Sequence, residues 1–147
     1  MNTAAAISAY NNVGIETAVM SADPHKLIAM LFDGALLAIT RAREETLTEQ
    51  TAAKGHSISK AIAIIGEGLN ASLDHKVGGK LAEDLSALYA YMVRRLVDAN
   101  LNNDVSTLDE VSGLLMELKD AWDAIRPQVV GAADSGSRPP SGTLANG

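Results

Sequence analysis

Apolar residues recur with helical spacing in four segments of the chain. Residues 24–48, 57–73, 80–100 and 106–127 each carry apolar side chains three or four positions apart, which is the period of an amphipathic helix. Short stretches rich in Gly, Asn and Asp separate these segments. Because short links favour antiparallel neighbours, the pattern predicts an all-α, antiparallel four-helix bundle over residues 21–126.

Local signals set the expected helix ends. Asp23 is a good cap for the first helix, and Pro24 suits its first position, where no backbone N–H is needed. Gly55 is expected to close the link after this helix, so that the second helix begins two residues later. Ser106 is expected to begin the fourth helix in an arrangement similar to a capping box, and Pro127 to end it.

The two ends of the chain differ from the bundle. Residues 1–20 are small and polar, but Ile7 and Tyr10 have helical spacing, so we expect a mobile N-terminal arm with a short helix. Residues 127–147 are rich in Gly, Ser, Pro and Ala and contain too little apolar surface to offset the entropy of ordering them. We therefore expect a disordered C-terminal tail.

The first helix has an unusually broad apolar face. One stripe is formed by Leu27, Leu31, Ala35, Ala38 and Ala42, and a second by Ile28, Phe32, Leu36 and Ile39. Met30 and Leu37 fall outside both stripes, among charged residues. A helix at the rim of a bundle needs a narrower face. Two interpretations stay open: neighbours cover this helix, or part of it forms an apolar groove for a partner.

The other helices add candidates for such a groove. In the third helix, Leu81, Leu85, Leu88, Met92 and Leu96 form the expected core stripe, Tyr89 and Val93 widen it, and Tyr91 lies on the charged side. In the second helix Ile64 points away from the core stripe, whereas the fourth helix is a simple core amphipath. The candidate partner-binding residues are Ile7, Tyr10, Leu27, Met30, Leu31, Leu37, Ile64, Tyr89, Tyr91 and Val93.

Charge and composition narrow the classes of function. The formal net charge is −6, and an acidic chain without a basic stripe is unsuited to nucleic acid. There is no cysteine, no signal peptide and no apolar run of the roughly 20 residues that a membrane span needs. We therefore expect a soluble protein that does not insert into membranes.

The residues suggest no catalytic or metal chemistry. His25, His56 and His75 have no ligand partners at metal-binding spacing, and His25 and His75 are expected to be exposed. We expect no enzyme activity, no metal and no cofactor. Two alternatives to a specific carrier remain: a histidine phosphotransfer protein using His56, although this residue is expected at a helix start, and a generic helical interaction module.

Several short segments follow one another in a specific order. They are Ala9-Tyr10, residues 21–35, 60–65, 69–74 with Gly78-Gly79, 88–92, 95–100, 108–111, 114–118 and 121–122. In this order they resemble the flagellar secretion chaperone family, which binds flagellin. Lys76 departs from the pattern, because an acidic residue is expected there. The resemblance covers about residues 7–126 and does not extend into the tail.

The resemblance implies a cytoplasmic, non-enzymatic chaperone with a four-helix bundle. It implies that the C-terminal segment of flagellin wraps the bundle, and that binding prevents premature polymerisation and supports export by the flagellar type III secretion apparatus, whose components are further expected partners. Tyr10 occupies the place of the family's arm tyrosine near the flagellin groove. We expect the arm, through Ile7 and Tyr10, to cover this groove until flagellin displaces it. The sequence leaves monomer and homodimer both open.

Overall fold

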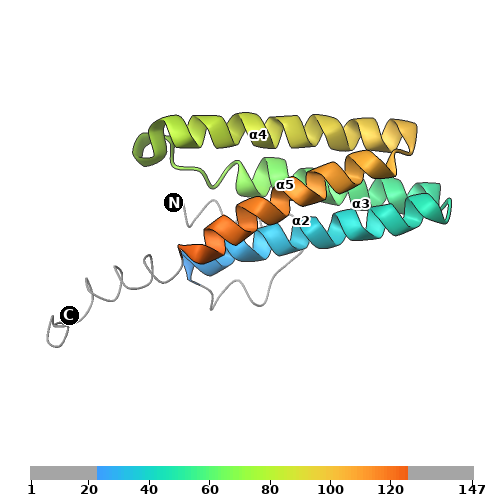
Figure 1. Cartoon of the computed structure of the whole chain (residues 1–147), viewed down its shortest axis with the longest axis horizontal. Coiled ribbons are helices and arrows are strands. Elements are labelled where there is room, and N and C mark those ends of the chain that lie inside the picture. The colour runs from blue at the N-terminus through green and yellow to red at the C-terminus, as the bar shows by residue number, and fades with distance from the viewer. Residues whose placement is uncertain (1–22, 126–147) are drawn as a thin grey trace, which may run out of the picture.

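The expected all-α bundle is confirmed. The computed structural model describes residues 23–125, and within that range it contains no strand. Its elements are α2 (Pro24–Leu47), α3 (Thr51–Ala63), the π-helix η2 (Ile64–Leu69), α4 (His75–Asn102) and α5 (Val105–Ala124). Consecutive long helices run in opposite directions, as Figure 1 shows. The expected arm and tail lie outside the described residues.

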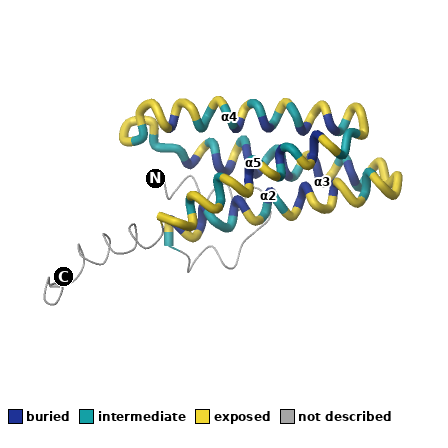
Figure 2. The backbone as a smooth tube through the Cα atoms, viewed as in Figure 1, coloured by how far each residue is buried: buried dark blue, intermediate teal, exposed yellow. Residues whose placement is uncertain are grey.

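The four long helices pack around one core, with α2 and α4 at opposite corners. α2 contacts α3, η2 and α5, and α4 contacts the same three elements. Buried positions face inward along every helix (Figure 2). The core consists mainly of Leu, Ile and Ala side chains, which fits the small aromatic content of the chain.

The broad apolar face of α2 is explained by its neighbours. All of the first stripe is buried, and so are Ile28, Phe32 and Ile39 of the second. Because three elements pack on α2, a face wider than that of a rim helix is needed simply to fill the core. The structure therefore supports the interpretation in which neighbours cover this helix, and leaves Met30 and Leu37 as its outlying apolar positions.

The start of α2 follows the expected capping. The side chain of Asp23 accepts a hydrogen bond from the backbone N–H of Lys26 at 2.7 Å, and Pro24 occupies the first helical position. The carboxylate satisfies one of the backbone donors that a helix start leaves without a partner. The prediction from the Asp-Pro pair is confirmed.

The expected start of the second helix was wrong. α3 begins at Thr51, six residues earlier than expected, and Gly55 lies inside it rather than stopping the chain. The chain reverses direction between α2 and α3 in a tight turn instead, in which Glu49 has a φ of 57°. The first turn of α3 is then held by Lys54, whose buried ammonium donates to the carbonyl of Asn100 and the side chain of Asn103.

Ile64 is buried, although its spacing predicted that it points away from the core. In η2 the N–H of Asn70 donates to the carbonyl of Ile65 at 2.9 Å, a bond that spans five residues instead of four. This wider turn shifts the helical register. Ile64 precedes this shift, since its own N–H donates to the carbonyl of Lys60. It is buried because the buried face of α3 is broad and also includes Ser57 and Ala61.

The start of α4 also differs from expectation. The helix begins at His75 rather than at residue 80, and it is kinked at Gly79, where φ is 51° and ψ is −123°. Leu81, expected in the core stripe, is 66% exposed. Leu81 follows the kink and keeps its helical spacing to Leu85, so its exposure belongs to the start of α4 and not to a changed register.

The cap of the fourth helix lies two positions before the expected place. Asp104 caps α5: its carboxylate accepts from the N–H of Thr107 at 3.3 Å and from the hydroxyl of Ser106 at 2.8 Å. These hydrogen bonds lower the pKa of Asp104, the bond from Ser106 having the largest effect. Ser106 is therefore a partner of the cap and not the cap itself. Pro127 lies outside the described residues.

Candidate protein-binding surface

His25 and Trp122 join the beginning of α2 to the end of α5. The rings stack with centroids 4.4 Å apart and planes within 5° of parallel. Nε2 of His25 lies 2.7 Å from the carbonyl oxygen of Trp122, and the indole N–H donates to the carbonyl of His25 at 2.9 Å. Because a carbonyl only accepts, Nε2 carries the proton. The expectation that His25 is exposed was wrong, since the side chain is 1% exposed under this stack.

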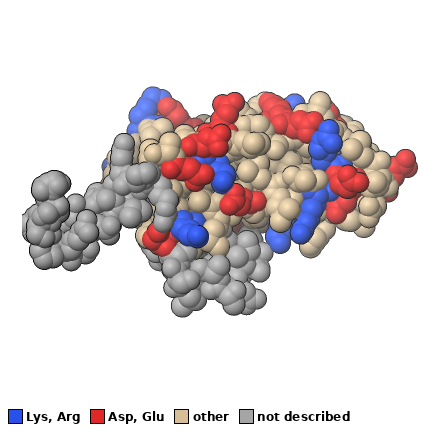
Figure 3. Space-filling view, turned by 60° about the horizontal axis from the view of Figure 1, so that its bottom comes forward, with Lys and Arg blue, Asp and Glu red and all other residues tan. Residues whose placement is uncertain are grey.

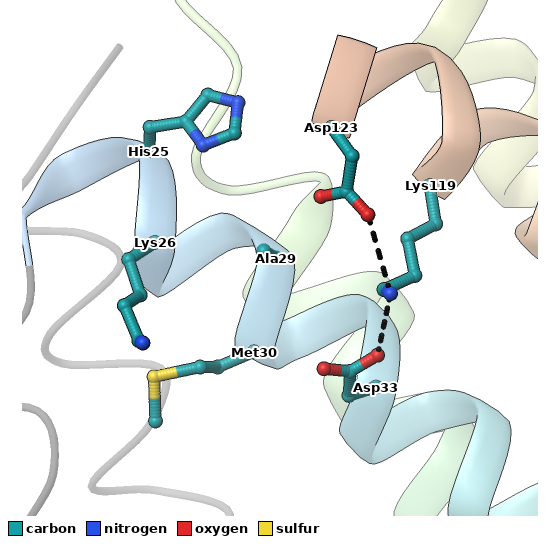
Figure 4. Close-up of a pocket in the computed structure, with 7 residues that line it drawn as sticks. All are labelled: His25, Lys26, Ala29, Met30, Asp33, Lys119 and Asp123. Atoms are coloured by element: carbon teal, nitrogen blue, oxygen red, sulfur yellow. Dashed lines mark ion pairs between the residues drawn. The ribbon is translucent and has the colours of Figure 1, made fainter. Parts of the chain in front are cut away.

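A small pocket lies beside this stack, between α2 and α5. Its volume is about 240 Å³, and it is lined by His25, Lys26, Ala29, Met30, Asp33, Lys119 and Asp123. In Figure 4 the ammonium of Lys119 lies between the carboxylates of Asp33 and Asp123, each at 3.3 Å. The hydrogen bonds to Asp123 and then to Asp33 raise the pKa of Lys119. These paired charges close one side of the pocket and leave Met30 as its largest apolar group.

Four of the predicted binding residues are core residues. Leu27, Leu31 and Ile64 are fully buried, and Tyr89 is 5% exposed. Burial raises the pKa of the Tyr89 hydroxyl to about 12. In this structure these side chains hold the helices together and do not present a surface to a partner. Ile7 and Tyr10 lie outside the described residues.

Two predicted residues of α2 reach the surface. Met30 is half-buried and Leu37 is 51% exposed. They are seven positions apart, which places them on the same side of the helix two turns from each other. Leu37 faces away from the core, whereas Met30 packs partly against it. Lys26, Asp33 and Arg41 are exposed on the same side of the helix.

Tyr91 is engaged in a polar network between α4 and α5. Its hydroxyl donates to a carboxylate oxygen of Glu110, and Arg95 donates to the other oxygen at 2.9 Å. Arg95 also donates to the hydroxyl of Thr107. The bond from Tyr91 and then the bond from Arg95 lower the pKa of Glu110. The tyrosine therefore ties the two helices together through its polar end.

Val93 belongs to a longer surface feature that sequence reasoning missed. Ala90, Val93, Val97 and Leu101 follow one another along α4 at intervals of three, four and four residues, and we call them the α4 strip. Val93 is half-buried, Val97 is 43% exposed and Leu101 is 75% exposed. The signal was present in the sequence as helical spacing beside the core stripe, but the expected helix ended at residue 100 and excluded Leu101.

Charged side chains do not gather into a basic area on the face shown in Figure 3, where acidic and basic groups are interspersed. Several are paired across helices, as in the contact of Arg43 with Asp109 at 2.8 Å. Within residues 23–125, no cluster of His, Asp or Glu side chains is arranged to hold a metal ion. In the same range, no helix is long and apolar enough to cross a membrane. The candidate binding features of the described surface are therefore apolar: the α4 strip, and Met30 and Leu37 on α2.

Comparison with known proteins identifies the family. The family model described as flagellar protein FliS matches residues 6–129. The chain belongs to the FliS family. It is 52% identical to the flagellar secretion chaperone FliS of Salmonella typhimurium over 128 residues, which cover 87% of this chain and 95% of that protein. It is 50% identical to the flagellar secretion chaperone FliSB of Pseudomonas aeruginosa over 82% of this chain and 94% of that protein.

Membership of the FliS family settles the broad class of function. FliS proteins are flagellar secretion chaperones and not enzymes, so this chain takes part in flagellum assembly and has a secretion substrate as a partner. The alternative based on His56 finds no support in this family. The expectation that His56 lies at a helix start was nevertheless wrong. His56 is exposed within α3, which begins at Thr51.

Proposed function

We propose that this FliS-family chain binds the C-terminal segment of flagellin in the cytoplasm, prevents its premature polymerisation and supports its delivery to the export apparatus. The observation that carries the proposal is the α4 strip, an uncharged row of apolar side chains along a long helix. A partner helix with apolar residues at matching intervals can pack on such a row. Each Leu or Val side chain that is buried contributes on the order of 1.5–3 kcal/mol before the costs of binding.

The positions of the apolar surfaces favour a partner that wraps around the bundle. The α4 strip lies on α4, whereas Leu37 and the partly buried Met30 lie on α2, at the opposite corner. A segment that contacts both must pass around α3 or α5. A long, flexible polypeptide can do this, while a compact partner reaches only one of the two surfaces.

The N-terminal arm has a place in this proposal. Ile7 and Tyr10 would cover apolar surface in the free chain until flagellin displaces them, which would limit self-association at a modest cost in affinity. Calorimetry of Tyr10→Ala against a flagellin C-terminal peptide tests the arm separately. Unchanged affinity together with unchanged solubility of the free chain would reject the covering role of the arm.

The oligomeric state of the chain is a separate question. Sedimentation of the wild-type chain distinguishes a monomer from a homodimer.

The central experiment is calorimetric titration with a synthetic peptide of the flagellin C-terminal segment and with flagellin lacking that segment. The peptide is expected to bind and the truncated flagellin is not. Val97→Asp and Leu37→Asp are each expected to weaken peptide binding about tenfold, because a charge replaces a side chain buried by the partner. Met116→Asp is the matched control, since Met116 is 54% exposed on α5, similar to Leu37 at 51%.

Three outcomes would reject parts of the proposal. Failure of the wild-type chain to bind the peptide would remove flagellin's C-terminal segment as the substrate. Wild-type affinity in both aspartate variants would leave flagellin as the substrate but remove these two surfaces. Equal losses in Met116→Asp and Leu37→Asp would also remove them, because the effect would then be general and not local.

A further inference from the structure

The most exposed member of the α4 strip stands at the very end of its helix. Leu101 is 75% exposed, and α4 ends one residue later, at Asn102. The last carbonyl groups of a helix have no partner within the helix, so the final turn tends to fray. A partner helix that packs along the whole α4 strip therefore needs this turn to be held in place.

A side chain from another helix holds this turn. The ammonium of Lys54, in α3, donates to the carbonyl of Asn100 at 2.9 Å and to the side-chain oxygen of Asn103 at 2.5 Å. These two acceptors come before and after Leu101 in the sequence. The start of α3 and the end of α4 lie at the same end of the bundle (Figure 1). Asn103 also closes the helix itself, because it has a φ of 50° and its N–H donates to the carbonyl of Ala99.

The charge of Lys54 makes this link unusual. Lys54 is 4% exposed, and its two acceptors are uncharged oxygens. None of the ion pairs among residues 23–125 includes it. Burying an ammonium without a carboxylate costs free energy, which charge-assisted hydrogen bonds and the negative end of the α4 dipole offset in part. An apolar side chain would hold α3 in the core without that cost, so the charge serves the end of α4.

We propose that Lys54 is a positioning residue for cargo binding, which fixes the last turn of α4 so that Leu101 is presented in line with the rest of the α4 strip. Lys54 does not touch the cargo itself, because it is buried. A side chain that is held in place before binding loses less conformational freedom when a partner packs on it. This inference rests on the proposed function, in which the α4 strip binds the C-terminal segment of flagellin.

A double-mutant cycle on peptide binding tests this role. Lys54→Met removes the donors and keeps much of the length of the side chain, and Leu101→Ala shortens an exposed side chain. The affinity for the flagellin C-terminal peptide, measured by calorimetry, is expected to fall about fivefold in each single variant. The double variant is expected to bind about as weakly as Leu101→Ala alone, because Lys54 acts through Leu101. Independent effects would instead multiply to about 25-fold.

Two controls separate positioning from general stability. His25→Ala removes a buried contact between α2 and α5 and is expected to bind the peptide within about twofold of wild type. Hydrogen exchange of the free chain is expected to be about tenfold faster or more at the amides of residues 101–104 in Lys54→Met, but not in His25→Ala.

A variant at the surface repeats the test if circular dichroism shows that Lys54→Met does not fold. Asn103→Gly tolerates the positive φ and removes one of the two acceptors. It is expected to weaken peptide binding about threefold, and this loss is expected to disappear in the Leu101→Ala background.

The contrary results are distinct from failure of the proposed function. Wild-type affinity in Lys54→Met, or a loss that persists in the Leu101→Ala background, would overturn the positioning role. Equal losses in Lys54→Met and His25→Ala would also overturn it, because the effect would then be one of stability. In each of these cases the wild-type chain still binds the peptide, so the proposed function stands. If the wild-type chain does not bind the peptide, the proposed function fails and the role of Lys54 fails with it.

Discussion

At the scale of single residues, the contact between His25 and Trp122 shows what helical periodicity does not reveal. The two residues are 97 positions apart, yet their rings stack and each contacts the other's backbone carbonyl. From the sequence, a histidine in the first turn of a helix looked exposed. Its burial depends on a partner that is distant in the sequence, on the last helix, and spacing within one helix carries no information about that partner.

The contact predicts a measurable loss of stability in His25→Ala. The substitution removes one buried hydrogen bond and the ring stack, which together contribute about 2 kcal/mol. The free energy of unfolding, measured by urea denaturation and circular dichroism, should fall by about this amount. Fluorescence of Trp122, the single tryptophan of the chain, should change in the folded state because its stacking partner is gone.

His75→Ala is the matched control for this measurement. His75 is exposed at the start of α4, so its replacement should change the free energy of unfolding by less than about 0.5 kcal/mol. A stability of His25→Ala equal to that of His75→Ala would show that the stack contributes nothing to holding α2 and α5 together.

At the scale of elements, the four helices and the core faces of α2 and α5 could be predicted, because both are properties of local spacing. In α2 the stripes that begin with Leu27 and Ile28 are nearly all buried. The remaining errors concern how neighbours cover a helix. The buried face of α3 is broader than predicted and includes Ser57, Ala61 and Ile64, and Leu81 is exposed in the first turn after the kink at Gly79. Spacing within one helix does not show which of its positions the neighbouring helices cover.

The same limit applies to the candidate surface. Met30, Leu37 and Val93 could be placed at the edges of helical faces from spacing alone. Whether such an edge is open depends on which helices pack beside it, and the sequence did not specify that arrangement. Tyr91 illustrates the difference: it stands on the charged side as predicted, but its hydroxyl is engaged with Glu110 of another helix.

The glycines of the helices give a paired prediction about element stability. A Cβ at Gly113, in the middle of α5, would meet no atom within 4 Å, so Gly113→Ala should stabilise the fold by about 0.5–1 kcal/mol through helix propensity. A Cβ at Gly78 would lie 2.9 Å from the Cβ of Ala82. Gly78→Ala should therefore destabilise the fold by about 1 kcal/mol or more.

Thermal and urea unfolding of the two glycine variants beside the wild-type chain measures both effects. The opposite signs are the informative result, since general effects of alanine on the unfolded chain act on both variants alike. If Gly78→Ala is as stable as Gly113→Ala, the close approach of Gly78 to Ala82 is not needed for the fold.

At the scale of the whole molecule, the charged side chains and the apolar α4 strip occupy different parts of the surface. Acidic and basic groups are interspersed and partly paired between helices, as in Arg43 with Asp109 and Arg95 with Glu110. The α4 strip contains no charged residue. The net charge of −6 therefore acts as a diffuse field around the molecule, while the surfaces proposed for flagellin are apolar.

This separation predicts that flagellin binding depends weakly on salt. Between about 0.05 M and about 0.5 M NaCl, the Kd for the C-terminal peptide should change less than about threefold, because screening acts on exposed charges and not on apolar contacts. Calorimetry at several temperatures should give a negative heat-capacity change, the mark of apolar burial.

The unfolding free energy of the free chain is measured at each salt concentration, so that an effect on folding is not mistaken for one on binding. A Kd that rises tenfold or more across this range, with little change in heat capacity, would show that the acidic surface recognises flagellin by charge pairing, and the α4 strip would then not be the main binding surface.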